Sequence, residues 1–401
     1  MVATGTLLTL AVAGAAALFM AWAIGAGSSG STPFAPAVGA NAISVMRAGF
    51  VVGILGLSGA VLQGANVTEA VGSELVVGAP LTPTAAIVGL VTAAALVAVG
   101  VFAGYPIATA FTVTGAVVGA GLALGRGPAW PKYQEIAALW LLVPFVGGGI
   151  AFGTAKLLRD ERVPETVAIP TLAALVGMLL ANIEFVLLGP GSEARGIAAA
   201  VVRAVVGEAA TGTPVLAGKV LATLAFAGIL AGALRVDMTA DEAAGQRHFL
   251  LALGGLVAFS AGGSQVGLAL GPLLPLLGPE TVAVPLTALL FAGGLGLLVG
   301  SWTGAPRMIK ALAQDYSSLG PRRSIAALIP SFAIAQSAVF FGVPVSFNEI
   351  IVSAIIGSGY AAGGSGVSGR KMVYTVLAWI GSLALALGVS YGGYLAVSAV
   401  L

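Results

Sequence analysis

The sequence predicts an all-α membrane protein: a polytopic helix bundle of about 10–12 spans, built as two inverted repeats with broken or re-entrant helices. Three observations lead to this prediction. Charged residues make up only 8% of the chain, and hydrophobic residues 58%. Apolar segments of spanning length recur from end to end, and two stretches repeat at a near-constant offset. A soluble protein carries roughly 25% charged residues, whereas lipid-facing helices do without them.

Apolar segments long enough to cross a bilayer account for most of the chain. A spanning helix needs about 20 mostly apolar residues. The segment before Arg47 contains no basic residue, so we expect its apolar run to be a retained span and not a signal peptide. Basic loops on both sides of one span leave the topology open. The predicted spans are 5–24, 40–63, 84–103, 107–125, 135–156, 168–189, 214–233, 248–271, 281–302, 324–341 and 373–400, with a shorter apolar piece at 349–362.

Composition also excludes several classes of function. The chain has no cysteine and one histidine, His248, so thiolate and multi-histidine metal sites are excluded. The net charge of +2 and the lack of a basic run argue against a nucleic-acid partner. No nucleophile–base pair or phosphate-binding loop is present, so we predict no enzyme, no catalytic residue, no metal site and no cofactor.

Charged residues in or near apolar segments are candidates for function, because a charge at membrane depth is costly. The more economical interpretation is that most lie at the membrane interface, with their charged ends in water. These residues are Glu69, Glu74, Glu184, Arg195, Arg203, Glu208, Lys219 and Glu280.

Two stretches of the sequence correspond to each other. Residues 104–125 align with residues 342–363, and the match includes Pro106 with Pro344. A second pair, residues 21–25 and 258–262, has an offset one residue smaller. Offsets of 238 and 237 residues indicate duplication, so we predict a first transmembrane repeat at 1–210 and a second at 211–401.

Duplicated membrane chains are typical of secondary transporters, whose site lies between the repeats near the bilayer midplane. Interrupted helices at matching places mark that site, because lipid cannot satisfy exposed backbone groups. Helix N-termini that point into such a site favour an anion. Four segments combine polar side chains with glycine or proline: 25–33, 106–112, 260–265 and 344–349.

Three further segments carry a family resemblance. Val67–Gly72, the run from Arg322 and Arg323 into Pro344-Val345-Ser346, and Lys371–Trp379 resemble parts of the inorganic phosphate transporter (PiT) family, which includes sulfate permeases. The likeness covers most of the chain in order. It implies a multi-pass cell-membrane protein that transports inorganic phosphate. Two alternatives stay open: a permease for sulfate or another oxyanion, and a degenerate membrane scaffold that no longer transports.

The signature motifs of that family are altered here. The family has two Gly-Ala-Asn-Asp-type motifs, whose Asn and Asp positions are occupied by serines in the first copy and by a serine and a glutamine in the second. Its two Pro-Val-Ser-Thr-Thr-His motifs read Pro-Ile-Ala-Thr-Ala-Phe and Pro-Val-Ser-Phe-Asn-Glu. The resemblance implies that these positions and their neighbours bind the substrate: Ser28, Ser29, Thr109, Thr112, Ser264, Gln265, Ser346 and Asn348.

Glu349 is the coupling candidate, because it stands where the family has histidine. It is the one carboxylate in the four segments. The loss of both motif carboxylates argues against a sodium site, since a hard cation prefers charged oxygen ligands. A carboxyl group that binds and releases a proton predicts coupling to protons instead. The expected partners are phosphate or a similar oxyanion and the lipid bilayer, with a homodimer as an option.

Overall fold

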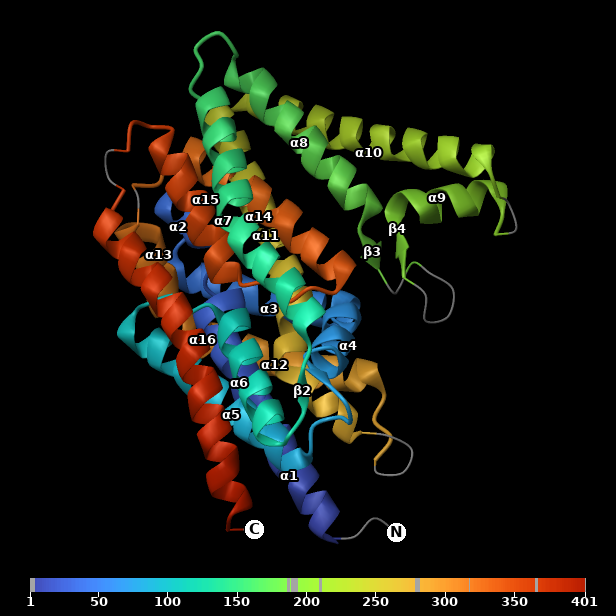
Figure 1. Cartoon of the computed structure of the whole chain (residues 1–401). Helices are drawn as coiled ribbons and strands as arrows, with labels where there is room; N and C mark the ends of the chain where they lie inside the picture. The colour runs from blue at the N-terminus through green and yellow to red at the C-terminus, as the bar shows by residue number, and fades with distance from the viewer. Residues whose placement is uncertain are drawn as a thin grey trace.

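A computed structural model describes residues 4–185, 188, 194–208, 211–277, 282–316, 318–364 and 367–400 of the chain. Helices dominate it, and within these ranges ten are long and apolar enough to cross a membrane. The prediction of an all-α, multi-pass membrane bundle is therefore confirmed (Figure 1). The predicted residue Glu280 lies outside the described ranges.

The elements fall into two similar series joined by a helical arm. The first series is α1 (Thr4–Ile24), the π-helix η1 (Gly25–Ser29), α2 (Ala35–Gly39), α3 (Val45–Gln63), α4 (Ala65–Ser73), β1 (Val76–Val77), α5 (Pro83–Ala103), α6 (Thr109–Ala123), β2 (Gly127–Pro128) and α7 (Trp130–Leu157). The arm is α8 (Glu165–Asn182), β3 (Glu184–Phe185), β4 (Arg195–Gly196), α9 (Ile197–Val206) and α10 (Thr213–Ala240). The second series is α11 (Glu242–Leu270), the 3₁₀ helix η3 (Gly271–Leu276), α12 (Leu286–Thr303), α13 (Ala305–Asp315), α14 (Pro321–Phe341), α15 (Phe347–Tyr360) and α16 (Gly369–Ser398).

Two helical hairpins show the duplication in three dimensions. Helix α5 ends at Gly104 and α14 ends at Gly342, and both glycines adopt left-handed backbone angles, with φ of 72° and 64°. A side chain would strain that conformation, so glycine sets both helix ends. Pro106 and Pro344 follow, and neither can extend the preceding helix.

The returning helix of each hairpin is short. Helix α6 has 15 residues and α15 has 14, so each rises only about 22 Å, less than the roughly 30 Å of a hydrocarbon core. The interpretation of 107–125 as a complete span was therefore wrong. A proline-bounded turn shortens it to a returning half of a re-entrant hairpin.

The two series run in opposite directions. Helices α7 and α16 each follow the hairpin of their own series, but α7 leads to the upper end of Figure 1 and α16 to the lower end. Both chain termini also lie at the lower end. The inverted arrangement is thus visible in the fold, whereas the division of the chain at residue 210 stays a prediction.

The interruptions expected at the other two segments differ from each other. After α1 the chain widens into the π-helix η1, as expected for an irregular segment. Residues 260–265, by contrast, are continuous helix within α11, so the expected break there was wrong. Ser260 donates a hydrogen bond to the Leu256 carbonyl, which shows how a polar residue is accommodated without breaking the helix.

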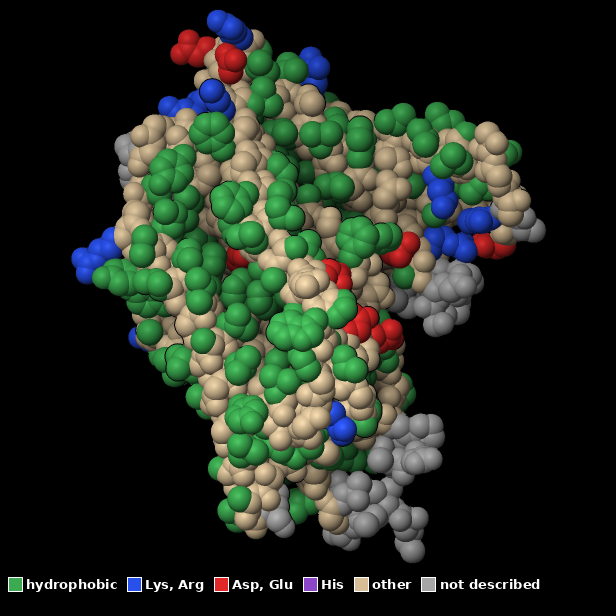
Figure 2. All heavy atoms as spheres, viewed as in Figure 1, with side chains coloured by type: hydrophobic (Ala, Val, Ile, Leu, Met, Phe, Trp, Pro, Cys, Tyr) green, Lys and Arg blue, Asp and Glu red, His purple; other side chains and the backbone are tan. Residues whose placement is uncertain are grey.

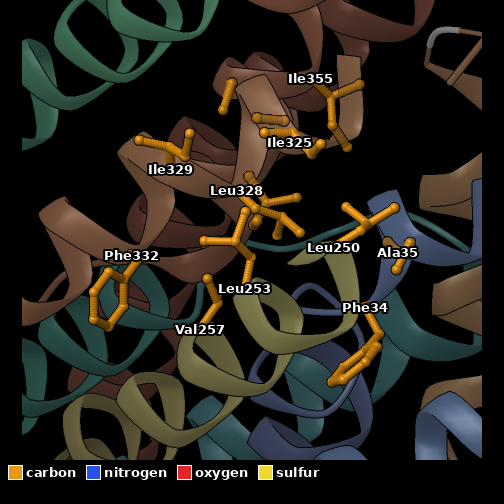
Figure 3. Close-up of a cluster of buried hydrophobic side chains, with 14 of the residues drawn as sticks. Phe34, Ala35, Leu250, Leu253, Val257, Ile325, Leu328, Ile329, Phe332 and Ile355 are labelled. Atoms are coloured by element: carbon orange, nitrogen blue, oxygen red, sulfur yellow. The ribbon is translucent and has the colours of Figure 1, made fainter. Parts of the chain in front are cut away.

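Close helix packing requires small residues where helices cross. A Cβ atom at Gly262 in α11 would collide with the Gly56 carbonyl of α3, and one at Gly357 in α15 would collide with the Gly148 carbonyl of α7. Larger side chains fill the space between α2, α11, α14 and α15, where Phe34, Leu253, Leu328 and Phe332 are buried (Figure 3). This packing holds the polar segments at fixed positions.

Apolar side chains cover much of the outer surface, as lipid contact requires, and Lys and Arg side chains gather at its upper end and on the arm (Figure 2). The candidate charged residues that the structure describes all keep some exposure, which the interfacial interpretation requires. Glu74 pairs with Lys132 at 2.7 Å, and Arg195 pairs with Glu208 at 2.7 Å. Within the described ranges, Glu349 is the one charged residue that is buried.

Candidate functional site

Three polar side chains from different helices meet where the two repeats face each other. The Thr109 hydroxyl of α6 donates to Gln265 Oε1 of α11 at 2.8 Å. The Ser28 hydroxyl of η1 donates to the same oxygen at 3.3 Å, and Thr109 Oγ1 lies 3.4 Å from Ser28 Oγ. Ser28 and Gln265 are 237 positions apart, which is the offset of the repeat. Equivalent positions of the two halves therefore touch at this centre.

Both hairpin tips are tied to this centre by side-chain amides. Gln265 Nε2 donates to the Val345 carbonyl at 2.7 Å. Asn348 Nδ2 donates to the Ile107 carbonyl at 2.6 Å and to the Gly27 carbonyl at 2.9 Å. Ile107 and Val345 are themselves equivalent tip residues, so each tip carbonyl accepts one amide hydrogen bond.

The chemistry of this cluster suits an anion. Its side chains are hydroxyls and amides, and all are buried, so the cluster is closed off from the molecular surface in this conformation. Helices α6 and α15 both begin here, so the positive ends of both helix dipoles lie at the cluster. The Ser29 and Ser264 hydroxyls are buried without a hydrogen-bond partner among the described residues, as is Asn348 Oδ1. The two serine hydroxyls are unused donors, and hydroxyl donors beside helix N-termini can bind an oxyanion.

Not every predicted site residue joins the cluster. Thr112 lies one turn beyond Thr109, but its hydroxyl donates to the Ala108 carbonyl of its own helix at 2.9 Å. Ser346 is the N-cap of α15 and accepts a hydrogen bond from the Glu349 N–H at 3.5 Å. The Glu349 side chain faces a separate, mostly apolar cavity between α7, α15 and α16. Among the described residues no group of three potential metal ligands is present.

Sequence reasoning missed two tryptophans that connect the halves. Trp379 of α16 donates to the Pro106 carbonyl at 2.8 Å, and Trp140 of α7 donates to the Pro344 carbonyl at 3.2 Å. Each tryptophan therefore binds the hairpin tip of the opposite repeat. The signal was available, since Trp140 and Trp379 are separated by nearly the repeat offset.

A second buried polar group was also missed. Gln336 Nε2 donates to Ser260 Oγ at 2.5 Å and to Gln63 Oε1 at 3.2 Å. Gln63 Nε2 in turn donates to the Glu184 carbonyl at 3.0 Å, at the root of the arm. Gln63 and Gln336 line a cavity of about 540 Å³ between the bundle and α8.

Inverted repeats, re-entrant hairpins and a buried polar centre between the halves define a class: multi-pass membrane transporters. Residues 24–390 match the model of the phosphate transporter family. The chain belongs to that family, which confirms the resemblance and places the protein among transporters and not enzymes.

Individual relatives agree with this assignment. An Arabidopsis thaliana protein named "Inorganic phosphate transporter 2-1, chloroplastic" is 23% identical over 90% of this chain and 68% of its own length. A Thermococcus kodakarensis protein named "Putative phosphate permease" is 26% identical over 90% of both chains. A solved structure titled "The sodium-dependent phosphate transporter" superposes with a TM-score of 0.81 over 98% of this chain at 22% identity, and so shares the fold.

Proposed function

We propose that this protein carries inorganic phosphate across the cell membrane, and that the cluster around Gln265 binds it. Family membership supports phosphate as the substrate. The observation that carries the site is the contact between Ser28 and Gln265, because equivalent residues of inverted repeats meet at the centre around which such folds alternate. The proposed binding residues are Ser28, Thr109, Gln265 and Asn348 of the cluster, together with their buried neighbours Ser29 and Ser264.

The proposed mechanism begins with opening of the closed cluster toward one side. Phosphate then replaces the hydrogen bonds that link Thr109, Ser28 and Gln265 to one another. The positive ends of α6 and α15 stabilise its charge, and the unused Ser29 and Ser264 hydroxyls supply further donors. The absence of a carboxylate from the cluster removes a source of repulsion. Rocking of one repeat against the other exposes the site to the opposite side.

Uptake of labelled phosphate into proteoliposomes tests this proposal. We expect excess unlabelled phosphate to block uptake, whereas sulfate at the same concentration should not. Ser264→Ala and Gln265→Ala should each reduce uptake by tenfold or more. Loss of one hydrogen bond to a charged group costs about 1.5–3 kcal/mol, which is of this size. A preference for sulfate would contradict phosphate as the substrate. Normal uptake by both variants would contradict the proposed site.

We also propose that transport is coupled to protons through Glu349. The cluster contains only neutral oxygen atoms, which are weak ligands for sodium without a carboxylate. Glu349 is buried and its Oε2 has no partner among the described residues, so a negative charge there is costly and a bound proton removes that cost. Glu349 lies in the first turn of α15, directly after the cluster residue Asn348. A change in the charge of Glu349 can therefore affect the site through Asn348.

Separate sodium and proton gradients test the coupling. The parent protein should respond to the proton gradient, and Glu349→Gln should lose that response while still exchanging phosphate. The one other titratable side chain in the described lining of the Glu349 cavity is Tyr360. Tyr360→Phe is therefore the matched control and should keep the parent's pH dependence. A requirement for sodium in the parent would rule the mechanism out.

We further propose that two copies associate as a homodimer. Helix α10 is the proposed interface, because it is the least buried of the ten candidate spans in the described ranges and its outer face is apolar, with Leu216, Leu221 and Ile229 all more than 60% accessible. The mass of the protein in lipid nanodiscs, measured by native mass spectrometry, distinguishes a dimer from a monomer. A mass of one chain at all lipid ratios would rule out the dimer.

A further inference from the structure

The cavity beside Glu349 is unlike the polar cluster. It has a volume of about 800 Å³ and lies between α7, α15 and α16, with contributions from α6. Its walls include the rings of Phe111, Trp140, Phe145, Tyr360 and Trp379. Clefts of roughly 300–1,000 Å³ with apolar and aromatic walls are typical of small-molecule sites.

The mouth of this cavity opens toward lipid. Leu141, Phe145 and Ile380 belong to its lining and are 68%, 72% and 58% exposed. They lie on α7 and α16, which are candidate membrane spans, so the medium they contact is the bilayer. Apolar side chains cover this face in Figure 2. A molecule that reaches the cavity through this mouth must therefore be soluble in the membrane.

Glu349 gives the cavity its chemical preference. The carboxyl is 1% exposed, lines the cavity, and has an oxygen, Oε2, without a partner among the described residues. The described lining contains no Lys, Arg or His to neutralise it. The charged residues of the helices around it, such as Lys132 and Lys156 of α7 and Arg370 and Lys371 of α16, lie outside the lining.

We propose that this cavity is a second binding site, reached from the lipid, for an amphipathic organic cation. The cationic centre replaces the proton on Glu349 and pairs with the resulting carboxylate, because either positive charge offsets the cost of burying a negative one. The apolar body packs against the aromatic rings, whose faces also attract a cation. An anion or a strongly hydrated inorganic ion does not satisfy both requirements. The proposal goes beyond phosphate transport and does not depend on it.

Two lipophilic ions of the same shape and opposite charge provide the test. Labelled tetraphenylphosphonium and tetraphenylborate are equilibrated with the full chain in phosphatidylcholine nanodiscs. We expect saturable binding of the phosphonium at one site per chain, weakened at least tenfold by Glu349→Gln. Glu69→Gln, which removes the same charge from an exposed position on α4, should bind normally. Tetraphenylborate should show no dependence on Glu349.

A second variant keeps the test decisive if Glu349→Gln does not fold. Val376 lies at the mouth and is 41% exposed, so Val376→Trp narrows the opening without removing the carboxyl. It should also weaken phosphonium binding. Equal binding of the phosphonium by the parent and both variants, or Glu349-dependent binding of the borate, would overturn the proposal. Phosphate uptake is not part of this measurement, so a negative result leaves the proposed function standing.

Discussion

At the scale of single residues, buried hydroxyl side chains differ in role according to the acceptor to which each hydroxyl donates. Thr109 donates to Gln265 across the repeats, whereas Thr112 donates to its own helix. Ser331 of α14 is buried as well and donates to the Ala327 carbonyl at 2.7 Å. A buried hydroxyl with a local backbone partner gives little to a ligand, while a hydroxyl in the cluster can exchange its partner for one.

Thr109→Val should therefore lower phosphate uptake, because it removes a cluster donor while keeping the shape of the side chain. We expect a reduction of roughly 10- to 100-fold in uptake at low phosphate, corresponding to about 1.5–3 kcal/mol. Ser331→Ala removes a buried hydroxyl outside the cluster and should leave uptake near the parent's level. Initial rates in proteoliposomes measure both, and equal losses in the two variants would show that the effect is structural.

At the scale of elements, the hairpin tips are held by the opposite repeat. Trp140→Phe and Trp379→Phe each remove one N–H donor from a tip carbonyl while keeping an aromatic ring. Each should lower the unfolding free energy by about 1–3 kcal/mol, because a buried carbonyl is left unsatisfied. Thermal unfolding in detergent measures this, with Trp130→Phe, at a 64% exposed position, as the control. A large loss from only one of the pair would contradict their equivalent roles.

The close crossing of α3 and α11 depends on glycine, because no other residue leaves room for the neighbouring backbone. Gly262→Ala places a methyl group against the Gly56 carbonyl, so α3 and α11 must separate. We expect a cost of several kcal/mol, seen as little folded protein in detergent extracts. Gly228 of α10 has no atom within 4 Å of an added Cβ, so Gly228→Ala is the matched control and should be recovered normally. Normal recovery of both variants would mean that the crossing tolerates the extra methyl group.

At the scale of the whole molecule, the sequence predicted the architecture more accurately than it predicted the contacts between side chains. Low charge, span length and the 238-residue offset were sufficient for an inverted helix bundle, because each reflects a constraint of the bilayer or of duplication. The patches around Ser28, Gln265 and Asn348 were found for the same reason. Period and composition do not report the direction of a side chain, so they did not separate Thr112 from Thr109 or Glu349 from the cluster. They also did not pair Trp140 and Trp379 with the opposite tips.

The distribution of charge around the whole molecule predicts its orientation. Arg159, Arg322 and Arg323 line one cavity. Arg159 lies two residues after α7, which leads to the end of the bundle opposite both termini in Figure 1. Basic residues favour the cytoplasmic side, so the termini should lie outside. The chain has no cysteine, so Ala243→Cys and Ser398→Cys each introduce a single reactive thiol. A membrane-impermeant maleimide should label Ser398→Cys in intact cells and Ala243→Cys only after lysis. The reverse pattern would invert the topology.

The exchange of partners between the halves has a consequence for the order of assembly during synthesis. Helix α6 is translated early, but two of its contacts form only later. The Pro106 carbonyl before it accepts a hydrogen bond from Trp379, and Gly119 packs against Leu387. Both partners lie in α16, the last helix of the described chain. The first half therefore cannot complete its own packing while it is still the only part in the membrane. A nascent chain that stalls before α16 would leave the Pro106 carbonyl without its Trp379 donor and Gly119 without its packing partner.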